Sequence, residues 1–144
     1  MNKPFNCQPP VCSKSPARWI GELDESEFEI QFYQQILEKQ PNDVLVLRQL
    51  GEQLAKTGKV AKTLELDLRL VKLRPRDEVA RYNLACSLAK MGQCDQAIAE
   101  LAVSLELGYA DWEHIESDVD LDNLRGLGGF RRLLTSWKKT LPRS

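Results

Sequence analysis

Apolar residues recur every three to four positions through the middle of the chain, which is the spacing of one face of an α-helix. The first clear series is Val44, Leu47, Leu50 and Leu54. Gly58 follows it, and a glycine just after such a series is a typical C-terminal stop of a helix. The pattern therefore predicts a helix that Gly58 closes.

A second helix is predicted from about Val60 to Leu73, because Pro75 follows and the residue before a proline disfavours helical geometry. This segment carries two apolar rows, one of Leu64, Leu68 and Val71 and the other of Leu66, Leu70 and Leu73. A helix that is apolar on two faces is expected to be covered on both. We therefore expect an inner helix in a stacked array.

The helix pair occurs twice. Residues 43–76 align without a gap with residues 77–110, a period of 34 residues from Asp43 to Asp77. Seven aligned positions are identical, namely Asp43/Asp77, Leu50/Leu84, Leu54/Leu88, Ala55/Ala89, Lys56/Lys90, Gly58/Gly92 and Leu73/Leu107. In the second copy, Gly92 closes the first predicted helix and the second continues up to Gly108. The chain thus contains two copies of one structural unit.

A helix pair with this period resembles the tetratricopeptide repeat. Leu50-Gly51 and Pro75 match the family pattern in the first copy, and Leu84-Ala85 and Ala97 match it in the second. The pattern's other large positions are occupied by different residues, namely Leu47, Asp67, Arg81, Leu101 and Tyr109. The resemblance, to a small bacterial-type member, implies an all-α fold: a right-handed α-solenoid of stacked antiparallel helix pairs, with about two full and two partial repeats.

The same period places the flanking segments. Shifted back by one unit, the second helix falls on Glu25–Lys39. Shifted forward, a short acidic first helix begins at Trp112 and ends near residues 121–124, and a last amphipathic helix follows. The segment from Asp118 to Phe130 resembles the degenerate terminal unit of many bacterial members of the family.

These registers divide the chain. We expect a helical domain at residues 21–144, with repeats at 43–76 and 77–110 and partial units at 22–42 and 111–140. Residues 1–20 contain Pro4, Pro9, Pro10 and Pro16 and no helical pattern, so they are expected to form a disordered arm.

Composition and charge narrow the function classes. The chain of 144 residues has 20 basic and 21 acidic residues, a net charge of -1, so no overall field favours nucleic acid. No apolar run is long enough to cross a membrane, and the N-terminus does not resemble a secretory signal. We therefore expect a cytoplasmic protein whose four cysteines are thiols.

Groups for catalysis or metal binding are sparse. The single histidine, His114, is expected at the surface or at a helix cap. Asp118, Asp120 and Asp122 alternate as in a calcium loop, but Asn123 stands where that loop needs glycine, so they are interpreted as N-terminal helix charges and solvated surface acids. The cysteines, at positions 7, 12, 86 and 94, lack the paired spacing of a zinc site. The sequence predicts no enzyme activity, no cofactor and no metal.

Function in this family follows from the concave surface that the first helices line. The resemblance places ten groove residues there, namely Leu45, Arg48, Gln49, Glu52, Lys56, Val79, Tyr82, Asn83, Cys86 and Lys90. Lys56 and Lys90 occupy equivalent positions and would favour an acidic ligand segment. The two-lysine, two-asparagine clamp for chaperone tails is matched only at Asn83, so chaperone-tail binding is not predicted.

The sequence thus predicts a protein-protein interaction module that acts as an adaptor, a scaffold or a dedicated chaperone. The alternative is a self-assembling scaffold, for example a homodimer, because arrays of this length often need further units for stability. Replacing Arg48 and Tyr82 together by alanine is expected to weaken partner capture without changing helicity. Tyr82 could instead pack against a neighbouring helix.

Overall fold

The computed structural model describes residues 24–140, and every regular element within that range is helical. The elements are α2 (Glu25–Lys39), α3 (Val44–Lys56), α4 (Val60–Leu73), α5 (Glu78–Lys90), α6 (Cys94–Glu106), α7 (Trp112–Ser117), the 3-10 helix η1 (Val119–Leu124) and α8 (Gly128–Thr140). This confirms the all-α expectation. The predicted arm at residues 1–20 lies outside the described residues. None of the described helices has the length and apolar character that crossing a bilayer requires.

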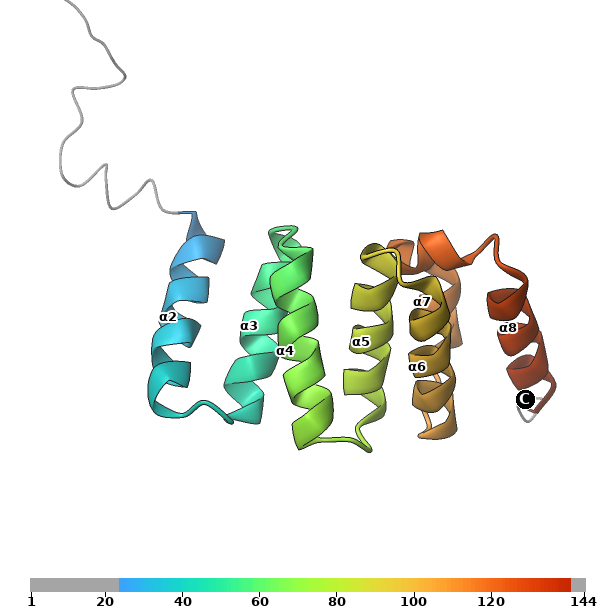
Figure 1. The fold of residues 1–144 in the computed structure, drawn as a ribbon, viewed down its shortest axis with the longest axis horizontal. Coiled ribbons are helices and arrows are strands. Elements are labelled where there is room, and N and C mark those ends of the chain that lie inside the picture. Colours follow the sequence, from blue (N-terminus) through green and yellow to red (C-terminus); the bar gives the residue numbers. More distant parts are fainter. Residues whose placement is uncertain (1–23, 141–144) are drawn as a thin grey trace, which may run out of the picture.

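Helices α2 to α6 lie side by side in the order of the sequence. The connections alternate between the two ends of the row, so successive helices from α2 to α6 run antiparallel (Figure 1). Each of these helices packs against its neighbours in the chain, and α5 and α6 also contact η1. The terminal unit therefore folds back against the second repeat, and α8 packs on α6.

The ends of the repeated helices use the same backbone device. After α3, the amide of Lys59 donates to the carbonyl of Leu54 (2.9 Å) and that of Gly58 donates to Ala55 (3.1 Å). Equivalent bonds close α5 at Gly92. Gly58 and Gly92 have φ angles of 75° and 79°, a conformation that strains any residue with a side-chain Cβ. The glycine stops predicted from the sequence are confirmed.

The starts of the first helices are capped at the same interval. The carboxylate of Asp43 accepts from the amide of Val46 (3.1 Å), and that of Asp77 accepts from Val79 and Ala80 (both 3.0 Å). Asp111, one further period along the chain, caps α7 by accepting from the amide of His114 (3.0 Å). The repeat register therefore extends into the terminal unit, where α7 is a shortened first helix.

Helix α4 departs from the expectation that both of its apolar rows are covered. Leu66 and Leu70 are buried between α3 and α5, but Leu68 on the other row is 49% exposed. Leu64 and Val71, on the same row as Leu68, are partly buried. They pack against the core of the second repeat, which includes Leu84, Leu88 and Leu101. Leu68 is therefore only about half covered, unlike Leu66 and Leu70.

A candidate binding pocket between the repeats

A pocket of about 380 Å³ opens among α3, α4, α5 and the α7–η1 segment. Its walls include seven of the ten groove residues expected from the sequence, namely Arg48, Gln49, Glu52, Tyr82, Asn83, Cys86 and Lys90. Leu45, Lys56 and Val79 lie outside it, all three of them exposed. The structure thus gathers most of the predicted residues around one cavity, and their role in binding stays a prediction.

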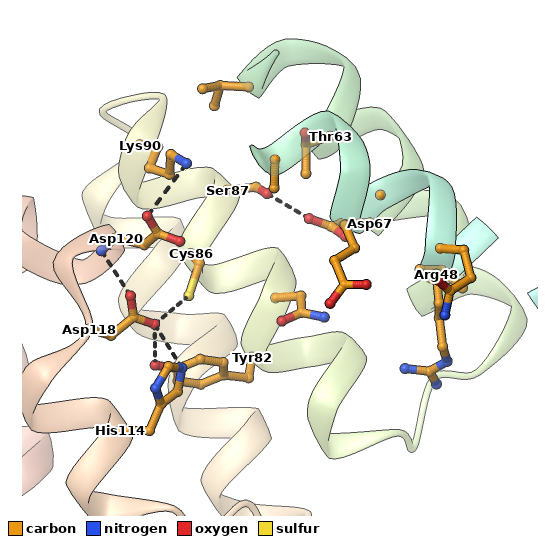
Figure 2. Close-up of a pocket in the computed structure, with 17 residues that line it drawn as sticks. Arg48, Thr63, Asp67, Tyr82, Cys86, Ser87, Lys90, His114, Asp118 and Asp120 are labelled. Carbon is orange, nitrogen blue, oxygen red and sulfur yellow. Dashed lines mark hydrogen bonds and ion pairs between the residues drawn. The ribbon is translucent and has the colours of Figure 1, made fainter. Parts of the chain in front are cut away.

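Other pocket residues were not anticipated. Six polar side chains from α4, α5 and the terminal unit also line the pocket: Thr63, Asp67, Ser87, His114, Asp118 and Asp120 (Figure 2). Of these six, only Asp67 could have been singled out from the sequence, because it occupies the position of the apolar Leu101 in the second copy. The contribution of the terminal unit depends on how that unit folds back, which a repeat period does not specify.

Tyr82 is a packed residue and not an open contact. Its side chain is 3% exposed, its ring stacks on that of Tyr109 with centroids 4.2 Å apart, and its hydroxyl donates to Asp118 Oδ2 (2.7 Å). Burial, together with the negative charge of Asp118, raises the pKa of this phenol. The expected Arg48/Tyr82 double variant would therefore damage the fold. Loss of binding by this variant would therefore not by itself test the pocket.

Asp118 is the centre of this part of the wall. Besides Tyr82, its Oδ2 receives the thiol of Cys86 (3.6 Å) and lies 3.2 Å from His114 Nε2, while its Oδ1 accepts from the amide of Asp120 (2.9 Å). Its side chain is 10% exposed, so the interpretation of Asp118 as a solvated surface acid was wrong, whereas its expected place at a helix N-terminus is confirmed because it caps η1. The carboxylate fastens the terminal unit to α5.

Cys86 also lies inside this group. Burial, followed by the charge of Asp118, raises the pKa of its thiol, so the sulfur stays protonated near neutral pH. Cys94, the other cysteine in the described range, is partly buried and packs against the core of the second repeat. Cys7 and Cys12 lie outside the described residues.

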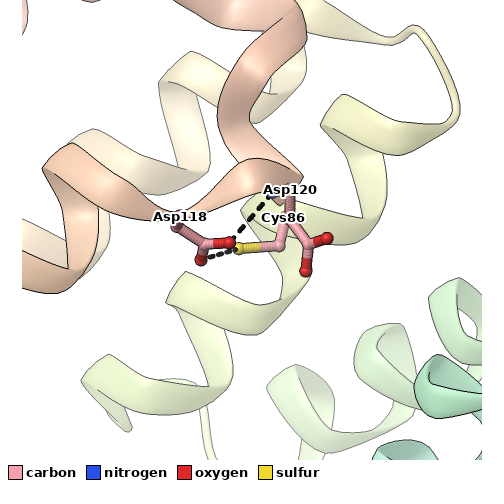
Figure 3. A group of neighbouring side chains, drawn as sticks. All are labelled: Cys86, Asp118 and Asp120. Atoms are coloured by element: carbon pink, nitrogen blue, oxygen red, sulfur yellow. Dashed lines mark hydrogen bonds between the residues drawn. The ribbon is translucent and has the colours of Figure 1, made fainter.

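Cys86, Asp118 and Asp120 could together hold a metal ion, because their ligand atoms lie within 4.8 Å of one another (Figure 3). Each already has a partner within the protein. Asp118 accepts from Tyr82 and Cys86, and Asp120 pairs with the ammonium of Lys90 at 3.4 Å. A cation here would have to displace the thiol proton and compete with Lys90. With these contacts, the three side chains hold the α7–η1 segment against α5.

The positive side chains of the pocket are both neutralised internally. Arg48 forms an ion pair with Asp77, and Lys90 forms one with Asp120. Burial opposes ionisation of Asp77, but hydrogen bonds from Ala80, the Arg48 guanidinium and Val79 outweigh it and lower the pKa of Asp77. Lys56 does not line the pocket. The pair of Lys56 and Lys90, on which the expectation of an acidic ligand rested, therefore does not line this pocket together.

Asp67 lies in the wall that α4 contributes. Its residue is 4% exposed, and its carboxylate accepts a hydrogen bond from the Ser87 hydroxyl at 2.6 Å. Burial raises the pKa of Asp67 to about 6, although the bond from Ser87 opposes this rise. Asp67 has no ion-pair partner within residues 24–140.

The sequence is similar to parts of two larger proteins. No family model matches the sequence. A chloroplastic protein of Arabidopsis thaliana is 32% identical over 117 residues, which cover 79% of this chain and 35% of that protein. A peroxisomal targeting signal receptor of Candida glabrata is 32% identical over 90 residues, 62% of this chain and 15% of the receptor. The chain thus spans about a third of the first relative and a smaller part of the second, and it is similar in sequence to part of a receptor.

Proposed function

We propose that the chain is a tetratricopeptide-repeat protein, folded as a right-handed α-solenoid, that binds a peptide or helical segment of another protein. The observation that carries the proposal is the pocket, which collects first-helix side chains from both full repeats. Gln49 and Asn83 occupy equivalent positions, one period apart on α3 and α5. Their amides can both donate to and accept from the backbone of an extended segment.

Two further considerations support a binding role. One relative is by name a receptor for a targeting signal, which is consistent with recognition of a protein segment by this kind of sequence. The raised pKa of Cys86 also keeps the one thiol among the described pocket residues protonated near neutral pH, which does not favour it as a nucleophile. We therefore propose a non-catalytic adaptor, scaffold or dedicated chaperone. A cytoplasmic location stays a prediction.

The test replaces Gln49 and Asn83 together by alanine. A library of random peptides displayed on phage is first selected on the wild-type chain, and individual peptides are then titrated against each variant. We expect the double variant to bind at least about tenfold more weakly, because two backbone contacts are lost. Neither amide forms a hydrogen bond within the described part of the chain, so the thermal midpoint should be unchanged.

The matched control replaces Gln34 and Gln35, which are exposed on α2 and lie outside the pocket. It should bind as the wild type does. Equal affinity of the Gln49/Asn83 variant would place binding elsewhere, and a selection that yields no peptide would contradict the proposed function.

Self-assembly is a second candidate because α2 exposes an aromatic face. Phe28 and Phe32, one helical turn apart, are 60% and 51% exposed. By the repeat register Phe32 corresponds to Leu66, which the preceding α3 helps to bury, whereas no first helix precedes α2 in the described range. Concentration-dependent light scattering would show a dimer that replacing both phenylalanines by glutamate abolishes. A monomer at all concentrations would remove this candidate.

A further inference from the structure

The charges that line the pocket are predominantly negative. Four carboxylates, from Glu52, Asp67, Asp118 and Asp120, face two permanently basic side chains, Arg48 and Lys90. Both basic groups are already paired, as described above. A ligand that enters this pocket therefore meets no free permanent cation among the described residues, but it does meet carboxylates.

Two of these carboxylates, Glu52 and Asp67, have no cationic partner within residues 24–140. The other two do have partners: Asp118 contacts the Tyr82 hydroxyl and His114, and Asp120 pairs with Lys90. Glu52, on the exposed side of α3, takes part in none of the ion pairs, and neither does Asp67. One unpaired acid thus lies at the mouth of the pocket and one in its wall.

The position of Asp67 makes it informative. In the second repeat the equivalent residue is Leu101, which is fully buried. An apolar side chain is therefore the residue type expected at this position of the repeat. A buried carboxylate without a cation reduces stability, and departures of this kind from a packing pattern are expected at functional sites. Ser87 on α5 holds one oxygen of Asp67 at 2.6 Å, and Figure 2 shows these two side chains pointing toward each other. Because its second oxygen forms no hydrogen bond with the described part of the chain, Asp67 can receive a donor from the pocket.

We propose that the pocket holds a lysine or arginine side chain of the partner segment, with its charge between Glu52 and Asp67. This inference rests on the proposed function and specifies the chemistry of the partner. The apolar stem of such a side chain would lie against Ala55 and Leu70, which also line the pocket. The charged end would supply the cation that the two carboxylates lack. The partner is therefore a basic segment and not an acidic one.

The experiment uses the peptides selected from the phage library on the full chain. The selected sequences should contain a shared lysine or arginine, and replacing a shared lysine by norleucine should weaken binding at least about tenfold. Asp67→Asn should also lower affinity at least about tenfold, because it removes a buried partner of the cation. Glu52→Gln should lower it about two- to fivefold, as expected for a solvent-exposed ion pair.

The control is Glu65→Gln, which makes the same chemical change at an exposed position on α4 outside this pocket, and its affinity should match the wild type. Asp67→Asn keeps an acceptor for Ser87 and is not expected to unfold the protein, so its binding defect would report the lost charge. Selected peptides that lack basic residues, or that bind Asp67→Asn as tightly as the wild type, would overturn this inference and leave the proposed function intact. A library that yields no binder would instead contradict the proposed function itself.

Discussion

Replacing Tyr82 by alanine should destabilise the protein by about 3–5 kcal/mol, the usual cost of removing a buried aromatic side chain. The ring is 3% exposed and stacks on Tyr109, and its hydroxyl holds Asp118 of the terminal unit. The truncation would leave a cavity and remove the link between α5 and the α7–η1 segment. The free energy of unfolding, measured with urea at neutral pH, checks this expectation.

Tyr82→Phe is the matched control, because it keeps the ring and removes only the hydroxyl. It should cost about 0.5–1.5 kcal/mol, the range for one hydrogen bond, with a further contribution if Asp118 is left without a donor. Cys86 and His114 still contact that carboxylate, which limits the additional loss. An alanine variant as stable as the wild type would show that the terminal unit does not depend on this residue.

Replacing Asp67 by asparagine should increase stability at neutral pH by up to about 3 kcal/mol. Burial raises the pKa of this carboxyl from 3.8 to about 6, so between these values the folded protein binds more protons at Asp67 than the unfolded chain does. The contribution of Asp67 to stability therefore falls as the pH rises from about 4 to above 6. Asparagine does not titrate, so it removes this loss and still accepts a hydrogen bond from Ser87.

The measurement compares urea unfolding of the wild type and of Asp67→Asn across this pH range. The difference between the two curves isolates Asp67 from the other titrating groups, and it should grow with pH up to about 7. A constant difference between wild type and Asp67→Asn would show that the carboxyl titrates at its ordinary pKa in the folded protein.

Asp67→Asn is thus expected to raise the stability of the protein and to lower its affinity for a basic segment. The same carboxylate that lowers stability in the unliganded protein would gain a cation when a basic segment enters the pocket. A variant that is more stable and binds more weakly would be hard to explain by a purely structural role of Asp67. A carboxylate in place of a core leucine is then understandable as a binding group.

Local signals in the sequence were sufficient for most of the helical architecture. Helix α4 begins at Val60 and ends at Leu73, and α2 spans Glu25–Lys39, as the apolar spacing and the repeat period predicted. These boundaries follow from helical periodicity and from the proline just beyond each helix, Pro41 or Pro75, which act within a few positions along the chain. Seven of the ten expected groove residues also line one pocket, because equivalent positions of successive first helices face the same side.

The surroundings of those residues could not be obtained in this way. The family resemblance placed Tyr82 among the groove residues, but its burial depends on Tyr109 and on Asp118, which lies 36 positions further along the chain. The terminal unit departs from the helix pair after α7, so aligning it with the repeats gave no information on its contacts. The interpretation of Asp118 as a surface acid was wrong for this reason.

The sequence by itself therefore determined the helical elements and their register, since periodicity and capping are local properties. Only the tertiary structure decided which of these side chains are open to a ligand and what charge they present. Ion pairs such as Arg48–Asp77 and Lys90–Asp120 join different elements and cancel the charges that were predicted for the first helices. The electrostatic character of the pocket is a sum over elements brought together by folding, and no single helix contains it.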